Sequence, residues 1–277
     1  MIVFSILSLI RFHNLCLGTA AVLIATKLLN MAIIPAVYSC IFIVISAMAL
    51  GYIFNDILDL KSDSVNHPSR PLVKGAISKS SINIIIFFFV VLLCFAMQTI
   101  HEYAIYFLFL YVFPSLLLYN YFLQKTPLLG NILVSSLLGS IFLFTELVLL
   151  QTYYKLLIPF FLTFSITFLR EIIKDLEDYD GDLRANMKTV PIVLGCKTTR
   201  LILIVLFLLL IIGLPTPYFL SYYTINYLIL LLIFIEIPLI YSLFLLIKFP
   251  SKRTYTFLVK LFKFLCLLGL VIFMIER

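Results

Sequence analysis

The chain consists of long apolar runs separated by short polar segments. A helix needs about 20 residues to cross the hydrocarbon core of a bilayer, and most of the runs approach that length. They cover residues 12–30, 33–57, 80–99, 103–123, 131–151, 155–176, 200–214, 222–247 and 254–275. The seventh run is short, and "GLPTP" near its end marks a stop. Because the runs are continuous, without the alternation of a membrane barrel, they predict transmembrane helices.

The composition supports this pattern. Hydrophobic residues make up 64% of the 277 residues and charged residues 12%, whereas soluble domains are about 25% charged. A soluble chain of this length could not bury so much apolar surface. We therefore expect an all-α polytopic membrane protein, a single domain over residues 1–277 with nine transmembrane helices around a central cavity. No charged segment or small-residue cleavage site precedes the first apolar run, so no signal peptide is expected.

The formal net charge of +7 comes from basic residues that gather in short loops. The loops after the second, fourth, sixth and eighth predicted helices hold Lys61, Arg70, Lys74, Lys79, Lys125, Lys174, Arg184, Lys188, Lys197, Arg200, Lys248, Lys252 and Arg253. The opposite loops offer little beyond Lys155. The positive-inside rule then places the cationic loops and the N-terminus in the cytoplasm and the C-terminus outside, in a cell membrane. Orientation explains the charge, so no nucleic acid partner is expected, and nothing in the sequence indicates an obligate protein partner.

The five cysteines carry no pattern of their own. Four of them lie within apolar runs, and no pair has the spacing of metal ligands. We interpret them as small buried hydrophobic residues without a disulfide framework.

Two polar stretches interrupt the apolar pattern, each directly after an apolar run. They are "GYIFNDILDLKSDSVNHPSRPL" (residues 51–72) and "REIIKDLEDYDGDLRANMKTVPIVLG" (residues 170–195). Each places three aspartates at i, i+3 and i+7, a spacing that shares one helical face. The aspartates are Asp56, Asp59 and Asp63 in the first stretch and Asp175, Asp178 and Asp182 in the second.

The two stretches form an internal repeat. Shifting the first three aspartates by 119 gives the second three, and shifting Pro71 and Gly75 by 120 gives Pro191 and Gly195. Four predicted helices separate the copies, so both have the same orientation in the membrane. This favours a parallel duplicated helical unit. We expect the two loops to face each other across a shared cavity, as an Asp-rich cap on the cytoplasmic side.

Facing carboxylates repel each other and need a cation. Hard oxygen ligands suit Mg²⁺, which takes a few carboxylates together with waters and phosphate oxygens. The pattern predicts a site that holds a diphosphate through bridging Mg²⁺, with Arg70, Lys125 and Lys174 near enough to contact the phosphates. Solvated helix ends are the alternative for a single motif, but two motifs of matched spacing count against it. A calcium loop is discounted, because "DYDGD" has its glycine misplaced and Thr189 in place of the final glutamate.

The two stretches resemble the motifs of the UbiA superfamily of intramembrane prenyltransferases. "NDILDLKSD", followed by "HPSRPL", is similar to the first motif, N-D-x-x-D-x-x-x-D, and "DYDGD" is similar to the second, D-x-x-x-D. The resemblance covers nearly the whole chain, since nine helices with motifs after the second and sixth are the family's plan. It implies catalytic roles for Asp59 and Asp178. It also implies Mg²⁺ ligands among Asn55, Asp56, Asp59, Asp63, Asp175, Asp178 and Asp182.

Further positions resemble the family residue by residue. Asn14 in "IRFHN" matches a polar residue that faces the cavity, whereas Arg11 beside it is interpreted as an interfacial anchor. Tyr121 and Lys125 in "YFLQK" match a Tyr-x-x-x-Lys pattern. The resemblance implies that this lysine approaches the diphosphate and that the tyrosine lies near the reacting carbon. An aromatic-belt position remains the alternative for Tyr121. Substrate binding is thus expected from Asn14, Asn55, Arg70, Lys125 and Lys174.

The implied reaction moves an isoprenyl group from an allylic diphosphate to an acceptor inside the membrane. "REIIKDLEDYDGD", with Lys174, and "TPLLGNILVSSLLG", with Asn131, look closest to the family branch that makes digeranylgeranylglyceryl phosphate, an ether-lipid core. The expected donor is geranylgeranyl diphosphate and the expected acceptor geranylgeranylglyceryl phosphate. Two alternatives stay open. One is transfer to an aromatic acid or quinone precursor such as 4-hydroxybenzoate. The other is a transporter, which the position of the acids at helix ends disfavours.

Overall fold

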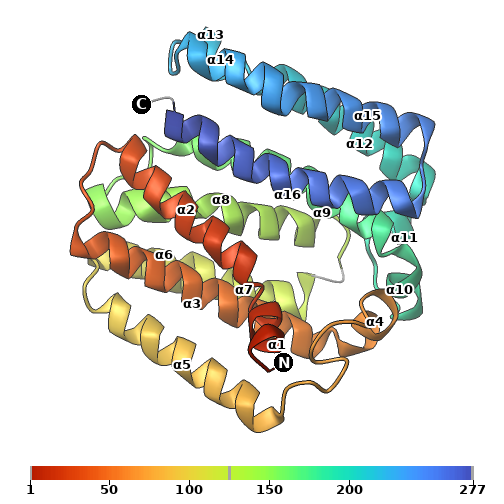
Figure 1. Ribbon diagram of the computed structural model, residues 1–277, viewed down its shortest axis with the longest axis horizontal. Coiled ribbons are helices and arrows are strands. Elements are labelled where there is room, and N and C mark those ends of the chain that lie inside the picture. The colour runs from red at the N-terminus through yellow and green to blue at the C-terminus, as the bar shows by residue number, and fades with distance from the viewer. Residues whose placement is uncertain (1, 124–125, 276–277) are drawn as a thin grey trace. The chain divides into compact units, whose positions relative to one another are not determined.

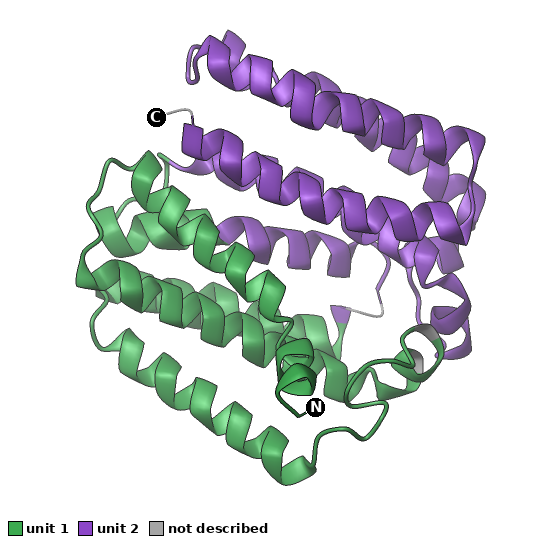
Figure 2. Ribbon diagram, in the orientation of Figure 1, with its two compact units in different colours: residues 1–122, 141–155 green, residues 123–140, 156–277 purple. Residues whose placement is uncertain are grey.

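The computed structural model describes residues 2–123 and 126–275, and all regular elements in these ranges are helices (Figure 1). The chain divides into two compact units (Figure 2). Unit 1 comprises residues 1–122 and 141–155, and unit 2 comprises residues 123–140 and 156–277. Each unit carries one of the two acidic stretches.

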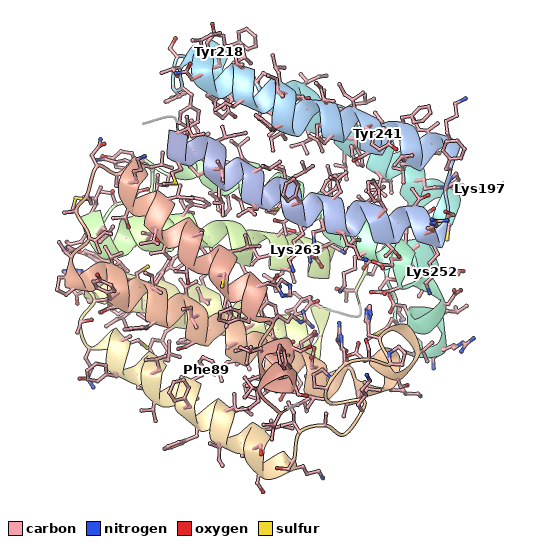
Figure 3. The ribbon with its side chains drawn as sticks, in the orientation of Figure 1. Phe89, Lys197, Tyr218, Tyr241, Lys252 and Lys263 are labelled. Carbon is pink, nitrogen blue, oxygen red and sulfur yellow. The ribbon has the colours of Figure 1, made fainter. Side chains whose placement is uncertain are left out.

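Unit 1 is built around the helix that leads into the first acidic stretch. Its elements are α1 (Ile2–Leu9), α2 (Phe12–Leu28), α3 (Pro35–Leu58), α4 (Leu60–Asn66), α5 (Lys79–Met97), α6 (Glu102–Phe107), the π-helix η1 (Leu108–Val112), α7 (Phe113–Tyr121) and the second half of α8 (Leu129–Leu150). The helices α2 and α5 pack on α3 (Figure 1). Ala49 and Ile53 of α3 are buried against Leu9 and Phe89, the latter labelled in Figure 3.

Unit 2 is built around the helix that leads into the second acidic stretch. Its elements are the first half of α8, α9 (Leu157–Glu177), α10 (Tyr179–Arg184), α11 (Val190–Leu194), α12 (Cys196–Gly213), α13 (Thr216–Phe219), α14 (Ile225–Leu231), the π-helix η3 (Leu232–Glu236), α15 (Ile237–Lys248) and α16 (Lys252–Ile275). The helix α9 packs on α16 and α12 (Figure 1). Phe207 and Phe262 meet edge to face between α12 and α16, with ring centroids 5.5 Å apart.

One close approach fixes α8 against α9 within unit 2. A Cβ built on Gly139 of α8 falls 2.9 Å from the backbone oxygen of Phe160 at the start of α9. Real Cβ atoms do not approach a backbone oxygen so closely, so a residue larger than glycine would force the two helices apart.

The membrane-spanning character expected from the sequence is confirmed. Within the described residues, seven helical segments are long and apolar enough to cross a bilayer, and α1 with α2 makes an eighth if that pair, bent by 51°, is one span. The helix α9 overlaps the sixth predicted span but carries charged residues in its last two turns. The all-helical polytopic architecture is therefore confirmed, whereas the count of nine spans, the central cavity and the single domain stay predictions.

Two of the predicted helices are not regular α-helices along their whole length. Residues 108–112 of the fourth predicted span and 232–236 of the eighth form π-helical turns. Pro114 and Pro238 follow these turns at the start of the next α-helix. Proline lacks an N–H and clashes with the carbonyl four residues earlier, so the chain widens its turn ahead of the ring.

Candidate functional site

The first acidic stretch lies at a break between two helices of unit 1. The helix α3 ends at Leu58 and α4 begins at Leu60, so Asp59 is the junction residue, with φ −92° and ψ 6°. This is the sparsely populated bridge region, where many active-site residues are found. The hydrogen-bonding pattern nevertheless continues through the junction. The Asp59 N–H donates to Asn55 O at 2.9 Å, and the Asp63 N–H donates to Asp59 O at 2.8 Å.

Arg70 holds two of the three carboxylates of this stretch together. Its Nη1 donates to Asp56 Oδ1 at 3.1 Å and also to Asp63 Oδ2. Both aspartates are buried, with 3% and 5% of their surface exposed. Burial raises the pKa of the Asp63 carboxyl, and the Arg70 guanidinium opposes that shift. The sequence predicted that Arg70 contacts phosphate. The structure places it on the carboxylates, and phosphate binding stays a prediction.

Arg11 corrects one interpretation made from the sequence. It is not a bilayer anchor, because its Nη2 donates to Asp56 Oδ1 at 2.7 Å and lies 3.5 Å from Asn55 Oδ1. Its guanidinium also stacks on the Tyr52 ring, 4.6 Å from the centroid. Arg11 sits between α1 and α2 in the left-handed conformation, φ 50° and ψ 54°. Strain of this kind in a non-glycine residue persists where surrounding contacts demand it.

Two amides and one phenol complete the cluster in unit 1. Asn14 Nδ2 donates to the Tyr52 hydroxyl at 3.1 Å, and Asn55 Nδ2 donates to Asp59 Oδ2 at 2.9 Å. Asn14 and Arg11 therefore both contact Tyr52, and Asn14 is a polar member of this cluster. Tyr52 was not among the residues predicted from the sequence. Its signal was its place four residues before Asp56, which puts both side chains on one face of α3.

Within unit 2, the backbone of the second acidic stretch has the same conformation as that of the first stretch in unit 1. The helix α9 ends at Glu177 and α10 begins at Tyr179, so Asp178 is the junction residue, with φ −88° and ψ 3°. The Asp178 N–H donates to Lys174 O at 2.9 Å, and the Asp182 N–H donates to Asp178 O at 3.0 Å. The spacing of the aspartates predicted that they share one helical face, and in both stretches the helix is interrupted at the middle aspartate.

The side chains of the second stretch have partners from α8 and α9. Asn131 Nδ2 of α8 donates to Asp175 Oδ2 at 3.0 Å. Lys174 Nζ lies 4.0 Å from Asp178 Oδ2, one helical turn along the chain. Asp178 and Asp182 are buried, with 9% and 8% of their surface exposed. Lys174 therefore neutralises part of this charge, and its predicted contact with a substrate phosphate remains a prediction.

The remaining predicted site residues are less well placed by the structure. Tyr121 ends α7 and is 60% exposed, which fits the aromatic-belt alternative as well as a catalytic role. Lys125 lies outside the described residues. The roles that the Tyr-x-x-x-Lys resemblance implies for both residues stay predictions.

The donor set of each stretch fits Mg²⁺ chemically. Among the described residues, no group of three or more histidine, cysteine or acidic side chains converges closely enough to hold a metal ion. Mg²⁺ does not need such a cage, since it commonly takes one or two carboxylates and completes its shell with waters and phosphate oxygens. Each stretch supplies buried carboxylates, some of which are paired with arginine or lysine. A phosphate-bound Mg²⁺ would bind favourably beside buried carboxylates that have cationic partners.

The internal repeat is seen in the backbone conformation as well as in the sequence. Gly75, three residues after the first stretch, and Gly195, the last residue of the second, both have positive φ, at 65° and 81°. Only glycine adopts such angles without strain, so both copies end on a turn that requires glycine.

Known proteins resemble this chain over most of its length. The UbiA prenyltransferase family model matches residues 14–267. Digeranylgeranylglyceryl phosphate synthase of Methanosphaera stadtmanae is 30% identical over 247 residues, which is 85% of this chain and 88% of that protein. A solved structure of a digeranylgeranylglyceryl phosphate synthase is 29% identical, with TM-score 0.75, covering 99% of this chain and 98% of that one.

A second solved structure extends the likeness of fold. It is a UbiA homologue from Archaeoglobus fulgidus bound to GPP and Mg²⁺, 16% identical, with TM-score 0.64 and coverage of 98% and 99% of the two chains. The family model and the archaeal relatives agree on one assignment. The chain belongs to the UbiA prenyltransferase family.

Proposed function

We propose that this prenyltransferase moves a geranylgeranyl group from geranylgeranyl diphosphate to geranylgeranylglyceryl phosphate. The observation that carries the proposal is the 30% identity to digeranylgeranylglyceryl phosphate synthase over 85% of the chain. The chain also keeps both acidic stretches, with matched junction aspartates at positions 59 and 178. We infer that both stretches serve this one reaction.

Mg²⁺ is the proposed cofactor. The residues proposed to hold it are Asn55, Asp56, Asp59, Asp63, Asp175, Asp178 and Asp182. When bound, Mg²⁺ supplies charge that stabilises the leaving pyrophosphate. The Archaeoglobus fulgidus homologue, whose structure contains GPP and Mg²⁺, supports this choice of metal and donor class.

The chain's own residues bind the charged end of the donor and keep the carboxylates in place. Arg11 and Arg70 fix Asp56, and Arg70 also fixes Asp63. Lys174, beside Asp178, and Lys125 are proposed to contact the diphosphate. Preorganised cations of this kind stabilise charge that develops as a bond breaks.

The covalent change is a substitution at the allylic carbon. The bond from that carbon to the diphosphate oxygen breaks, and pyrophosphate leaves with the electron pair. The acceptor hydroxyl oxygen then forms a new bond to the carbon and loses its proton. The products are an ether, pyrophosphate and a proton. Apolar surroundings are needed, because water would capture the allylic carbocation.

The membrane topology is part of the proposal. We propose nine spans, with α9 as the sixth, in a cell membrane, with the N-terminus and both acidic stretches on the cytoplasmic side. The distribution of lysine and arginine among the loops supports this orientation. The charged part of α9 lies in its last two turns, near the membrane surface, so the charges do not argue against a span.

An acceptor panel tests the proposed reaction. Purified protein receives Mg²⁺ and geranylgeranyl diphosphate with either geranylgeranylglyceryl phosphate or 4-hydroxybenzoate, and mass spectrometry identifies the lipid products. Addition of one prenyl unit to the glycerol phosphate lipid is the expected result. Addition only to the aromatic acid would keep the reaction class and overturn the acceptor. No product with either acceptor, across several donor lengths, would overturn prenyl transfer and favour a transporter.

A further inference from the structure

A second group of charges lies deeper along α9, away from the acidic stretch. Arg170 and Glu171 of α9 both lie close enough to Cys266 of α16 to act on it electrostatically, as does Lys263 of α16. The Cys266 thiol also hydrogen-bonds with Thr167 of α9. These side chains come from two packed helices of unit 2, so they form one cluster, which we call the α9–α16 cluster.

The packing of α9 against α16 places the two cations of the cluster, Arg170 and Lys263, at the same height along the helix pair. Lys252 Nζ at the start of α16 lies 4.0 Å from Asp180 Oδ2, just beyond the end of α9, and the Thr167–Cys266 contact joins an earlier residue of α9 to a later residue of α16. The helices are therefore antiparallel. Arg170 comes three residues after Thr167, and Lys263 comes three residues before Cys266. Both cations thus lie one turn from that contact, on the side nearer the second acidic stretch. Figure 3 labels Lys252 and Lys263 along α16.

The cluster contains a buried hydrogen-bond donor that has no acceptor. Arg170 Nη1 lies 3.0 Å from Glu171 Oε1. Arg170 Nε, however, is buried and has no hydrogen-bond partner. Charged residues within a membrane span are costly and commonly mark substrate pathways. A buried N–H donor without an acceptor adds to the cost.

We propose that Arg170 and Lys263 bind the phosphate group of the lipid acceptor. This inference rests on the proposed function, because the acceptor there carries a phosphate besides its reacting hydroxyl. A phosphate would supply acceptor oxygens for Arg170 Nε and a negative charge beside Arg170 and Lys263.

The position of the α9–α16 cluster along α9 suits the phosphate of the acceptor better than the diphosphate of the donor. Arg170 precedes Asp178 by eight residues, which is about 12 Å along a helix axis. A diphosphate held at Asp178 and Asp182 is therefore displaced from this level. The hydroxyl of the acceptor has to reach the allylic carbon next to that diphosphate, while its own phosphate stays clear of the like charge. Arg170 and Lys263 offer a second anion site that separates the two phosphates.

The test compares Arg170→Gln and Lys263→Gln with the wild type and with Lys260→Gln. Lys260 is the matched control, because it lies on α16 one turn from Lys263 and is exposed. Steady-state kinetics give KM separately for the donor, for geranylgeranylglyceryl phosphate and for geranylgeranylglycerol, which lacks the phosphate. Native mass spectrometry with the phosphorylated acceptor alone gives binding without turnover. Thermal unfolding and size-exclusion profiles report whether each variant is folded.

We expect both variants to raise the KM for the phosphorylated acceptor at least tenfold and to leave the donor KM within twofold. They should also lose bound acceptor in native spectra and reduce the preference for the phosphorylated acceptor over geranylgeranylglycerol. Arg170→Lys should recover part of the acceptor affinity, and Lys260→Gln should behave as the wild type. A fall in kcat with unchanged acceptor KM and unchanged binding would overturn the inference. If a glutamine variant does not fold, Arg170→Lys and Lys263→Arg are tested instead. The deciding quantity is again the KM for the phosphorylated acceptor relative to the KM for geranylgeranylglycerol.

The outcome separates this inference from the proposed function. If the wild type makes no product from the glycerol phosphate lipid, the proposed function fails, and native spectra with that lipid alone decide whether Arg170 and Lys263 bind it. If the wild type uses that lipid and the variants discriminate the phosphate as well as it does, only the role of Arg170 and Lys263 fails.

Discussion

Asp59 and Asp178 occupy the same backbone conformation, at φ −92° and ψ 6° and at φ −88° and ψ 3°. Each is the single residue between a long helix and a short one. Each accepts a backbone hydrogen bond from the aspartate four residues later, at 2.8 and 3.0 Å. Two residues separated by 119 positions have thus kept the same local geometry. We expect this shared geometry to serve a shared chemical task.

Asp59→Asn and Asp178→Asn should each abolish turnover. The amide keeps the shape of the side chain but removes the charge that a phosphate-bound cation needs, so we expect kcat to fall by on the order of 10²–10³-fold or more. Asp180→Asn is the matched control, because Asp180 lies in the same stretch but its side chain is 66% exposed. Radiolabelled donor gives the rate, and thermal unfolding shows whether the protein is folded. Normal activity in both variants would contradict a common metal and diphosphate role.

Removal of divalent metal should stop the reaction without unfolding the protein. Asp56, Asp63 and Asp178 already have cationic partners in Arg11, Arg70 and Lys174, so the fold does not depend on the metal to offset these carboxylates. EDTA should therefore eliminate pyrophosphate release, and excess Mg²⁺ should restore it. The thermal midpoint should change little in the absence of donor. Undiminished turnover after exhaustive chelation would exclude metal-dependent diphosphate chemistry.

Arg11→Gln should weaken the first stretch even though Arg11 lies 45 positions from Asp56. The substitution removes one of two cationic partners of a carboxylate that is 3% exposed. Loss of a partner in such a contact leaves buried charge uncompensated. We expect lower activity and a coupling of about 1–3 kcal/mol between the two side chains in unfolding.

A double-mutant cycle with Arg11→Gln, Asp56→Asn and the combined variant measures that coupling. Lys27→Gln is a control for charge removal from the neighbouring helix α2, since Lys27 lies in its last turn. Strict additivity of the two unfolding free energies would show that the contact contributes nothing.

Much of the fold could be read from the sequence, because long apolar runs leave a membrane chain little choice but helix. The two motifs were visible for a similar reason, since clustered carboxylates are rare in such a chain. The break at Asp59 was not visible, because i, i+3, i+7 spacing suits a continuous helix equally well. Arg11 was misread because a lone arginine near a helix start usually anchors at the interface. Its link to Asp56 depends on a left-handed turn and on packing between distant segments, neither of which leaves a local pattern.

The close contact between α8 and α9 makes a final prediction about stability. Gly139→Ala would place a Cβ 2.9 Å from the Phe160 carbonyl oxygen, and a backbone atom cannot swing aside. We expect this overpacking to destabilise the protein by about 1–3 kcal/mol. Gly269→Ala on α16 is the matched control, because a Cβ there meets nothing within 4 Å, and its effect should stay within about 0.5 kcal/mol. Unfolding in mixed micelles measures both. Because Asn131, the partner of Asp175, lies on the same helix as Gly139, a shift of α8 should also reduce turnover. Equal stability of the two variants would show that α8 and α9 do not approach so closely.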